Sequence, residues 1–246
     1  MAGKVLVDGK ICDKPGTLVS EASRIEILEP ENPFVSRGGL KLAGALETIN
    51  LEVDGATVLD VGASTGGFTD CLLKKGAGFI YALDVGYGQL DYSLRSNSRV
   101  TVMERYNIRH LTPEDLPTTP DLATVDVSFI SLKMVVPVIE RLKIPTLLAL
   151  VKPQFEAGRN DANKGEGVIR DPELHKNILA ELINFSCNHG YCFNQVAASG
   201  YPGPKGNLEF FIYFIRKNEA VCRCQKPVSP AVEKAVNYAH KEVLKN

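Results

Sequence analysis

The chain has 246 residues, of which 44% are hydrophobic and 23% charged, and its formal net charge at pH 7 is −1. This composition is typical of a globular protein with a substantial core. It excludes the overall basic excess of many nucleic-acid-binding domains, so an RNA site would have to be a local patch. No apolar run approaches the roughly 20 residues that span a bilayer, and the first residues lack the apolar core of a signal peptide, so we expect a cytoplasmic protein.

The first 30 residues are predicted to form a small β unit. Asp8-Gly9 lies between two short apolar runs, which is a signal for a hairpin, and a third strand is expected at 23–27. A unit this short cannot hold a hydrophobic core alone, and a Pro-containing linker follows it. We therefore divide the chain into a small unit (1–30), a main domain (31–217) and a C-terminal tail (218–246).

The main domain alternates strand-like and helix-like segments. Strands are expected at 57–61, 79–84, 100–104, 122–127 and 145–151, and helices at 39–49, 66–75 and 131–142. Alternation of this kind predicts a mostly parallel sheet with helices on both faces. A helix at 173–188 precedes strands at 191–199 and 208–216, which a short Gly/Pro turn makes antiparallel. The tail is expected to contain a Lys-rich helix at 231–244.

The six cysteines are dispersed along the chain, and no Cys-x-x-Cys pair occurs. Cys222 and Cys224 form the one close pair, and no histidine stands near them at a spacing that suits zinc. We therefore expect reduced thiols, without a structural metal or a disulfide.

A glycine-rich loop, DVGASTGGFTD at 60–70, follows the first strand of the main domain. A triphosphate-binding P-loop ends in Gly-Lys-Ser/Thr, and this stretch contains no lysine. A dinucleotide-binding loop has the spacing G-x-G-x-x-G, and here the second glycine is displaced. Two interpretations remain: a tight strand-to-helix turn without a ligand, and a loop for a ligand that carries no phosphate.

Three carboxylates at successive strand ends favour a ligand. Asp60, Asp84 and Asp126 each close an apolar strand, and ligands bind at the carboxyl ends of parallel strands. The backbone N–H groups that start the next helix can bind a carboxylate. Asp60 can serve an ammonium group, directly or through water, and Asp84 can accept from two ribose hydroxyls. An amino-acid end, a ribose and no phosphate together describe S-adenosylmethionine.

Four charged residues occupy positions that the stability of their strand or helix does not explain. Asp126, Lys152 and Glu209 lie in or next to apolar strand-like runs, and Lys41 follows the basic stretch Ser36-Arg-Gly-Gly. A solvated surface position explains any one of them, and for Lys41 alone it is the simpler explanation. Three such charges at the ends of one sheet instead indicate that these residues form a functional site.

Five separated motifs recur together in a known family. They are SRGGLKL (36–42), DVGASTGGFTDC (60–71), VDVSFIS (125–131), VKPQFE (151–156) and GNLEFF (206–211). The chain thereby resembles, over residues 1–217, the TlyA family. Its members are 2′-O-methyltransferases of ribosomal RNA, often called hemolysin A, and are similar to FtsJ/RrmJ-type RNA methyltransferases.

The resemblance implies a fold, a cofactor and a set of site residues. The fold would be α/β and Rossmann-like, with a mostly parallel seven-stranded sheet, one antiparallel strand and helices on both faces. The family's Lys-Asp-Lys-Glu tetrad falls on Lys41, Asp126, Lys152 and Glu209. The implied cofactor is S-adenosylmethionine, with no metal. Its expected binding residues are Asp60, Gly62, Ala63, Ser64, Thr65, Gly66, Gly67, Phe68, Asp84, Val85, Asn107 and Asp126.

Within the tetrad, we expect Lys152 to act as a general base or to orient the ribose 2′-hydroxyl, while Asp126 holds it and faces the methyl group. Lys41 and Glu209 would position the nucleotide. A lysine must be neutral to act as a base. Burial and Lys41 favour the neutral form of Lys152, whereas Asp126 and Glu209 oppose it, so the sequence leaves its protonation state open.

The stretch AGKVLVDGKICDKPG (2–16) resembles the C-terminal half of an S4-like RNA-binding module. The helical pair that precedes this half in such modules has no counterpart here, which leaves open whether the natural protein begins before Met1. Tyr201 or Phe155 can stack on a splayed base. The basic residues expected to contact RNA are Lys4, Lys10, Lys14, Arg37 and Lys205.

Two other functions compete with methylation of ribosomal RNA. The hemolysin name suggests a membrane-active protein, but the sequence has no long apolar helix and no basic amphipathic helix with aromatic anchors. The second alternative is RNA binding by a protein of this fold that has lost its catalytic activity, and the intact tetrad argues against it. The sequence does not identify the methylated nucleotide, the ribosomal subunit or the oligomeric state.

Overall fold

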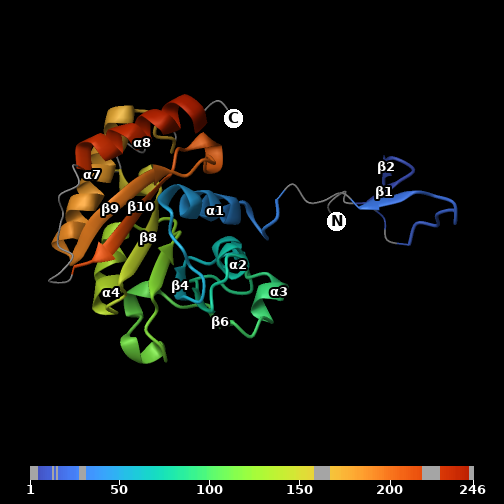
Figure 1. Ribbon diagram of the computed structural model, residues 1–246, viewed down its shortest axis with the longest axis horizontal. Helices are drawn as coiled ribbons and strands as arrows, with labels where there is room; N and C mark the ends of the chain where they lie inside the picture. The colour runs from blue at the N-terminus through green and yellow to red at the C-terminus, as the bar shows by residue number, and fades with distance from the viewer. Residues whose placement is uncertain are drawn as a thin grey trace. The chain divides into compact units, whose positions relative to one another are not determined.

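The computed structural model describes residues 5–12, 14, 16–27, 32–157, 167–217 and 228–243. The chain divides into two compact units, Met1–Pro33 and Phe34–Asn246. The division falls in the Pro-containing linker, and the tail helix belongs to the second unit. Figure 1 traces both units along the chain.

The small unit is a three-stranded antiparallel sheet in the order β2-β1-β3. Its strands are β1 (Val5–Val7), β2 (Lys10–Ile11) and β3 (Ile25–Ile27). Asp8 and Gly9 form the turn between β1 and β2, with φ values of 50° and 76°, a conformation that glycine and aspartate tolerate well. The hairpin predicted from this Asp-Gly pair is confirmed.

The large unit is built on a seven-stranded sheet in the order β6-β5-β4-β7-β8-β10-β9. The strands are β4 (Thr57–Val61), β5 (Phe79–Leu83), β6 (Val100–Met103), β7 (Leu122–Val125), β8 (Thr146–Val151), β9 (Tyr191–Ala198) and β10 (Phe210–Arg216). Strands β4 to β8 pair in parallel, while β10 is antiparallel to both β8 and β9. The predicted Rossmann-like sheet with one antiparallel strand is confirmed.

The order of the strands fixes where a ligand can bind. From β4 the chain builds outward through β5 and β6, and it then returns to the other side of β4 to form β7 and β8. The crevice at such a reversal, outside the carboxyl ends of the strands, is the usual ligand site of open α/β sheets. The glycine loop leaves β4 at this point.

Helices cover both faces of the sheet (Figure 1). They are α1 (Arg37–Ile49), α2 (Gly67–Lys74), α3 (Tyr92–Arg95), α4 (Val136–Arg141), α5 (Pro153–Glu156), α7 (Pro172–Asn188) and α8 (Val228–Glu242). Apolar side chains of α1 and α2 share one core with the sheet, and those of α4, α7 and α8 share another. Helix α8 is therefore part of the large unit's core.

The structure differs from the sequence prediction at four places. The helix predicted at 131–142 is divided into a 3-10 turn, η3 (Leu132–Met134), and α4, because Pro137 has no N–H to continue a single helix. Helix α8 begins earlier than predicted, since Pro230 lies in its first turn, where a missing N–H costs nothing. The short helices α3 and α5 were not predicted, because four residues give no measurable periodicity.

Within the described ranges, no helix is long and apolar enough to cross a membrane. In the same part of the chain, no group of three or more His, Cys, Asp or Glu side chains could hold a metal ion. Cys12 and Cys71 carry unlinked thiols, whereas Cys222 and Cys224 lie outside the described residues.

Candidate active site

Charged side chains from three adjacent strands meet at one edge of the large sheet. Asp126 and Lys152 directly follow the parallel strands β7 and β8. Glu209 directly precedes β10, which runs in the opposite direction. Because Phe210 pairs with Val151, the register brings Glu209 to the same edge as Lys152. Residues far apart in the sequence are thus assembled by the pairing of their strands.

The glycine loop after β4 is held against the neighbouring strand ends through its backbone. The N–H groups of Gly62 and Ala63 donate to the Leu83 carbonyl at 2.8 and 3.1 Å. Gly62 has a φ of 86°, and a Cβ at this position would lie 2.3 Å from the Asp126 carbonyl oxygen. Both the backbone conformation and the close approach of the Asp126 segment therefore require glycine here.

The second part of the loop packs against the start of α1. A Cβ at Gly67 would lie 2.2 Å from Ser36 Oγ and 2.9 Å from the Gly39 nitrogen. Just before α1, the Val35 N–H donates to Asp70 Oδ2 at 2.9 Å. The SRGGLKL motif and the glycine loop are therefore one packed structure, and α1 carries Lys41 from it.

Asp60 is fully buried beneath the loop. Its two carboxylate oxygens accept hydrogen bonds from the Thr69 and Thr124 hydroxyls, at 2.6 and 3.1 Å. Burial raises the pKa of Asp60 from its ordinary 3.8 to about 7, although the two hydroxyls oppose the rise. Asp60 thus ties β4 to α2 and β7. We expected Asp60 to serve an ammonium group either directly or through water, and its side chain has no exposed surface in this structure.

A second carboxylate, Asp84, is half-buried at the end of β5. Its oxygens accept from the Ser64 N–H at 2.8 Å and from the Gly86 N–H at 2.6 Å. Each carboxylate oxygen has a further lone pair, so Asp84 keeps acceptor capacity for a ligand hydroxyl. Asn107, after β6, accepts from the Arg109 N–H at 3.1 Å.

The residues predicted to bind the cofactor fall into three groups by exposure. The exposed residues are Ser64, Thr65 and Val85. The half-buried residues are Gly62, Asp84, Asn107 and Asp126. The buried residues are Asp60, Ala63, Gly66, Gly67 and Phe68. The buried group shapes the loop from below, so the surface that a ligand can touch comes from the other two groups.

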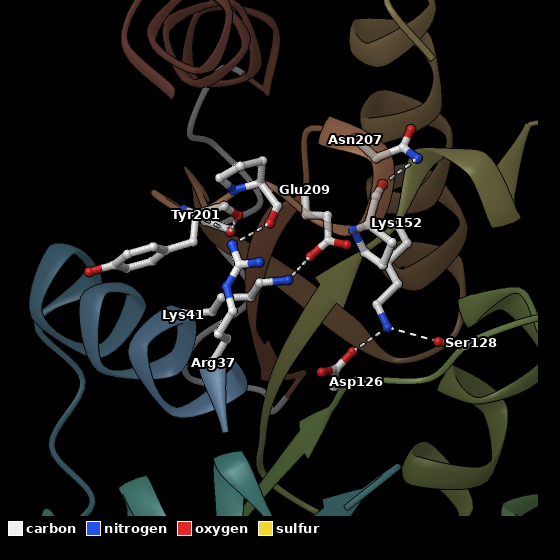
Figure 2. Close-up of polar contacts among 11 residues, drawn as sticks. Arg37, Lys41, Asp126, Ser128, Lys152, Tyr201, Asn207 and Glu209 are labelled. Carbon is white, nitrogen blue, oxygen red and sulfur yellow. Dashed lines mark hydrogen bonds and ion pairs between the residues drawn. The ribbon is translucent and has the colours of Figure 1, made fainter. Parts of the chain in front are cut away.

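The four predicted catalytic residues form two ion pairs (Figure 2). Lys41 Nζ lies 2.7 Å from Glu209 Oε2, and Lys152 Nζ lies 2.6 Å from Asp126 Oδ1. Lys152 Nζ also donates a hydrogen bond to Ser128 Oγ at 2.9 Å. The structure thus brings together charges from α1 and from the ends of β7, β8 and β10.

The Lys41–Glu209 pair is the more deeply buried, with 11% of the Lys41 side chain exposed and none of the Glu209 side chain. Burial raises the pKa of Glu209, and the charge of Lys41 opposes this rise. Glu209 Oε1 has no hydrogen-bond partner among the described residues, which is uncommon for a buried carboxylate oxygen. A Cβ at Gly203 would lie 2.0 Å from Glu209 Oε1, so the glycine makes room for the carboxylate.

The rim beside this pair is formed by the start of α1 and the loop before β10. Arg37 Nη2 donates to the Pro202 carbonyl at 3.3 Å, and the Ser199 hydroxyl donates to the Tyr201 carbonyl at 2.6 Å. Arg37, Tyr201 and Lys205 are exposed. Of the other predicted RNA-contact residues, Lys10 and Lys14 are exposed on the small unit, and Lys4 lies outside the described residues.

Two residues of the site were not predicted from the sequence. Ser128 is the second partner of Lys152. Phe129 is 90% exposed and has a φ of 63°, which an aromatic residue rarely adopts. Its ring centroid lies 4.8 Å from that of Phe155, so the two rings form a pair beside Lys152. The signal in the sequence was the motif VDVSFIS, which places an aromatic residue in a loop directly after a strand end.

A glycine loop at a topological reversal, carboxylates at strand ends and a lysine–carboxylate tetrad define a Rossmann-like methyltransferase. The FtsJ-like methyltransferase family matches residues 34–216. The chain belongs to this family, and within it to the TlyA group.

Curated relatives cover most of the chain. It is 41% identical over 239 residues to the 16S/23S rRNA (cytidine-2′-O)-methyltransferase TlyA of Mycobacterium tuberculosis, an alignment that covers 96% of this chain and 88% of that protein. It is 39% identical over 218 residues to Hemolysin A of Brachyspira hyodysenteriae, covering 87% of this chain and 90% of that protein.

Solved structures share the same architecture. One from Streptococcus thermophilus that carries the hemolysin name has a TM-score of 0.82 at 38% identity, covering 100% of this chain and 89% of that one. A second of that name, from Lactococcus lactis, has a TM-score of 0.75 at 40% identity and covers 82% and 97% of the two chains.

Proposed function

We propose that this methyltransferase transfers a methyl group from S-adenosylmethionine to a ribose 2′-hydroxyl of ribosomal RNA. The observation that carries the proposal is the pair of lysine–carboxylate contacts beside the glycine loop, Lys152–Asp126 at 2.6 Å and Lys41–Glu209 at 2.7 Å. The name of the TlyA relative, an rRNA (cytidine-2′-O)-methyltransferase, supports this choice of acceptor. Ribosomal RNA as substrate also favours a cytoplasmic location.

The loop region suits S-adenosylmethionine. Ser64 and Thr65 are exposed just before α2, and the N–H groups at a helix start attract a carboxylate. Asp84 has acceptor capacity for ribose hydroxyls, and half-buried Asp126 would face the reacting end. When bound, this cofactor would supply a methyl group attached to a positively charged sulfur. The sulfur leaves as a neutral thioether when the methyl group is transferred, so the reaction needs no metal.

Lys152 is suited to handle the 2′-hydroxyl. Besides its bond to carbon, a lysine nitrogen has three directions for hydrogen bonding. Asp126 and Ser128 occupy two of them. The third direction remains for the 2′-oxygen of the substrate. An N–H there orients the hydroxyl, and a lone pair there accepts its proton, so the same geometry serves either of the two roles that we expected for Lys152.

Lys41 and Glu209 would position the nucleotide. Their ion pair is fixed and nearly free of solvent, so it costs little reorganisation when a substrate arrives. Glu209 Oε1 lacks a partner among the described residues, but the Glu209 side chain has no exposed surface. Glu209 would therefore act on the nucleotide through Lys41, which keeps 11% of its side chain exposed. Breaking this buried pair would leave an uncompensated charge.

RNA would be held by the rim of the site and by the small unit. Arg37 and Lys205 are exposed for contact with phosphates, and the exposed Phe129 ring can stack on an unpaired base. We assign the small unit, with Lys4, Lys10 and Lys14, to an S4-like RNA-binding module. Phosphate contacts of this kind make affinity depend on salt.

Transfer of a labelled methyl group to ribosomal subunits tests the proposal. Wild-type protein is expected to label a ribosomal particle more strongly than naked RNA, and Lys152→Ala is expected to abolish the labelling. Lys75→Ala is the matched control, because Lys75 is a partly exposed lysine paired with Glu47 away from the site. Equal labelling by Lys152→Ala would refute the role of Lys152, and no labelling of any particle by the wild type would refute the substrate.

A further inference from the structure

The loop after β7, residues 126–132, is joined to the segment 152–156 at several points. Lys152 contacts Asp126 Oδ1 at 2.6 Å and Ser128 Oγ at 2.9 Å. The rings of Phe129 and Phe155 lie 4.8 Å apart and tilted by 48°. Both segments follow neighbouring parallel strands, so these contacts link one strand end to the next across the site.

Glu156, the last residue of α5, makes the third link. Its Oε2 accepts a hydrogen bond from the Ser131 hydroxyl at 2.6 Å, and its Oε1 accepts one from the Leu132 N–H at 2.8 Å. Both oxygens of one carboxylate are thus directed to the end of the 126–132 loop. Ser131 in turn caps η3, because its Oγ accepts from the Lys133 N–H at 3.1 Å.

The position of the Glu156 carboxylate disfavours its charged form. Burial raises the pKa of Glu156, and the donors Leu132 and Ser131, with the charge of Lys133, oppose the rise only in part. A second carboxylate near the same turn behaves differently. Glu181 on α7 pairs with Lys133 at 2.5 Å, but 65% of its side chain is exposed, and exposed pairs of this kind contribute little.

The loop that Glu156 holds is under backbone strain. Phe129 has a φ of 63°, a left-handed conformation that costs a non-glycine residue free energy. Phe129 is 90% exposed, so burial of its ring does not offset that cost. Contacts on either side of Phe129 must therefore keep the loop in this conformation.

We propose that Glu156 is a positioning residue of the methyl-transfer site. It fixes the 126–132 loop so that Asp126 and Ser128 stay on Lys152 and Phe129 keeps its exposed ring in place. This inference rests on the proposed function, because it assumes that Lys152 acts on the 2′-hydroxyl. Glu156 itself contacts the loop and not the reacting atoms.

Turnover by Glu156→Ala and Glu156→Gln, counted per cofactor-binding site, tests the inference. The concentration of sites and the affinity for S-adenosylmethionine are measured by calorimetry. In Glu156→Ala, kcat per site is expected to fall about 10- to 100-fold, since a small misplacement of reacting groups has effects of this size. Cofactor affinity is expected to fall by a much smaller factor than kcat, because apart from Asp126 the proposed cofactor-binding residues lie at the end of β4 or in the segments that follow β4, β5 and β6. Loss of folded protein would not give this difference.

Glu156→Gln is expected to recover most of the activity, because its amide oxygen can accept from the Leu132 N–H and its NH2 group can donate to Ser131 Oγ. Ser131→Ala is expected to lower kcat several-fold. The double variant Glu156→Ala/Ser131→Ala is expected to lose less activity than the product of the two single effects, since both changes break the Ser131–Glu156 contact. Glu181→Ala is the control and is expected to keep wild-type turnover.

The inference is overturned if Glu156→Ala keeps wild-type kcat per site, or if the two single effects multiply in the double variant. Should Glu156→Ala not fold, Ser131→Ala decides, and an unchanged kcat in that variant overturns the inference. Absence of methyl transfer by the wild type is a different result, since it refutes the proposed function itself.

Discussion

Replacing Asp60 by asparagine is expected to stabilise the protein increasingly as the pH rises from 5 to 8. Burial raises the pKa of the Asp60 carboxyl from 3.8 to about 7, so the folded protein keeps this proton to a higher pH than the unfolded chain does. Between these two values the folded state binds more protons, and stability therefore falls as the pH rises. Above about pH 7 the carboxyl is ionised in both states and the loss is complete.

The size of this effect follows from the two pKa values. Each unit of difference corresponds to about 1.4 kcal/mol, so the shift from 3.8 to about 7 costs the folded state about 4 kcal/mol at high pH. Between pH 5 and pH 8, roughly 2–3 kcal/mol of that cost develops. Asparagine has nearly the same shape and does not titrate, so it removes this part of the pH dependence.

Urea denaturation of wild type and Asp60→Asn at pH 5 and pH 8 measures the effect. The difference in unfolding free energy between the two proteins cancels all other titrations. At pH 8 this difference is expected to favour Asp60→Asn by roughly 2–3 kcal/mol more than at pH 5. A difference that is the same at both pH values would refute the reasoning. Because the ammonium group of the proposed cofactor would offset the cost of this carboxylate, Asp60→Asn is also expected to bind S-adenosylmethionine more weakly.

Three further predictions concern other parts of the large unit. Gly203→Ala would put a Cβ 2.0 Å from Glu209 Oε1, so it should displace Glu209 from Lys41 and abolish methyl transfer. Gly44→Ala is the control, because a Cβ there meets open space, and it should retain methyl transfer. Retained activity in Gly203→Ala would contradict this prediction. Phe129→Ala should lower kcat/KM for ribosomal particles about tenfold without changing cofactor affinity, and an unchanged kcat/KM would remove Phe129 from the site. His175 Nδ1 lies 2.9 Å from His240 Nε2, and burial lowers the pKa of His175 from 6.5 to about 4. The free energy of unfolding should therefore fall as the pH drops below about 6.5. Between pH 7 and pH 5, denaturation curves should show a fall that is about 2 kcal/mol smaller in His175→Phe than in wild type. An equal fall in both proteins would refute this prediction.

The sequence could predict the sheet and the edge at which the tetrad gathers. Alternating apolar strands and amphipathic helices have distinct periods, so β4 to β8 were recognised within one or two residues. Asp126 and Lys152 follow parallel strands, and parallel strands end at a common edge. Glu209 joins them because β10 runs the other way and places its start at that edge.

The pairing of these charges could not be predicted. Lys41 could have met Asp126 or Glu209, and the choice of Glu209 depends on how α1 packs on the glycine loop through Ser36, Gly39 and Gly67. Phe129 was missed for a related reason. Its positive φ is set by contacts with α5 and not by local propensity, which disfavours this conformation for an aromatic residue.

The chemical position of the methyl group tests the central claim most directly. After reaction with labelled S-adenosylmethionine and ribosomal subunits, the RNA is digested to nucleosides and the labelled product is identified by mass spectrometry. The Lys152–Asp126 and Lys41–Glu209 geometry predicts a nucleoside methylated on the ribose 2′-oxygen, present with wild type and absent with Lys152→Ala. A methyl group on a base, or a 2′-O-methyl group that persists with Lys152→Ala, would contradict the account.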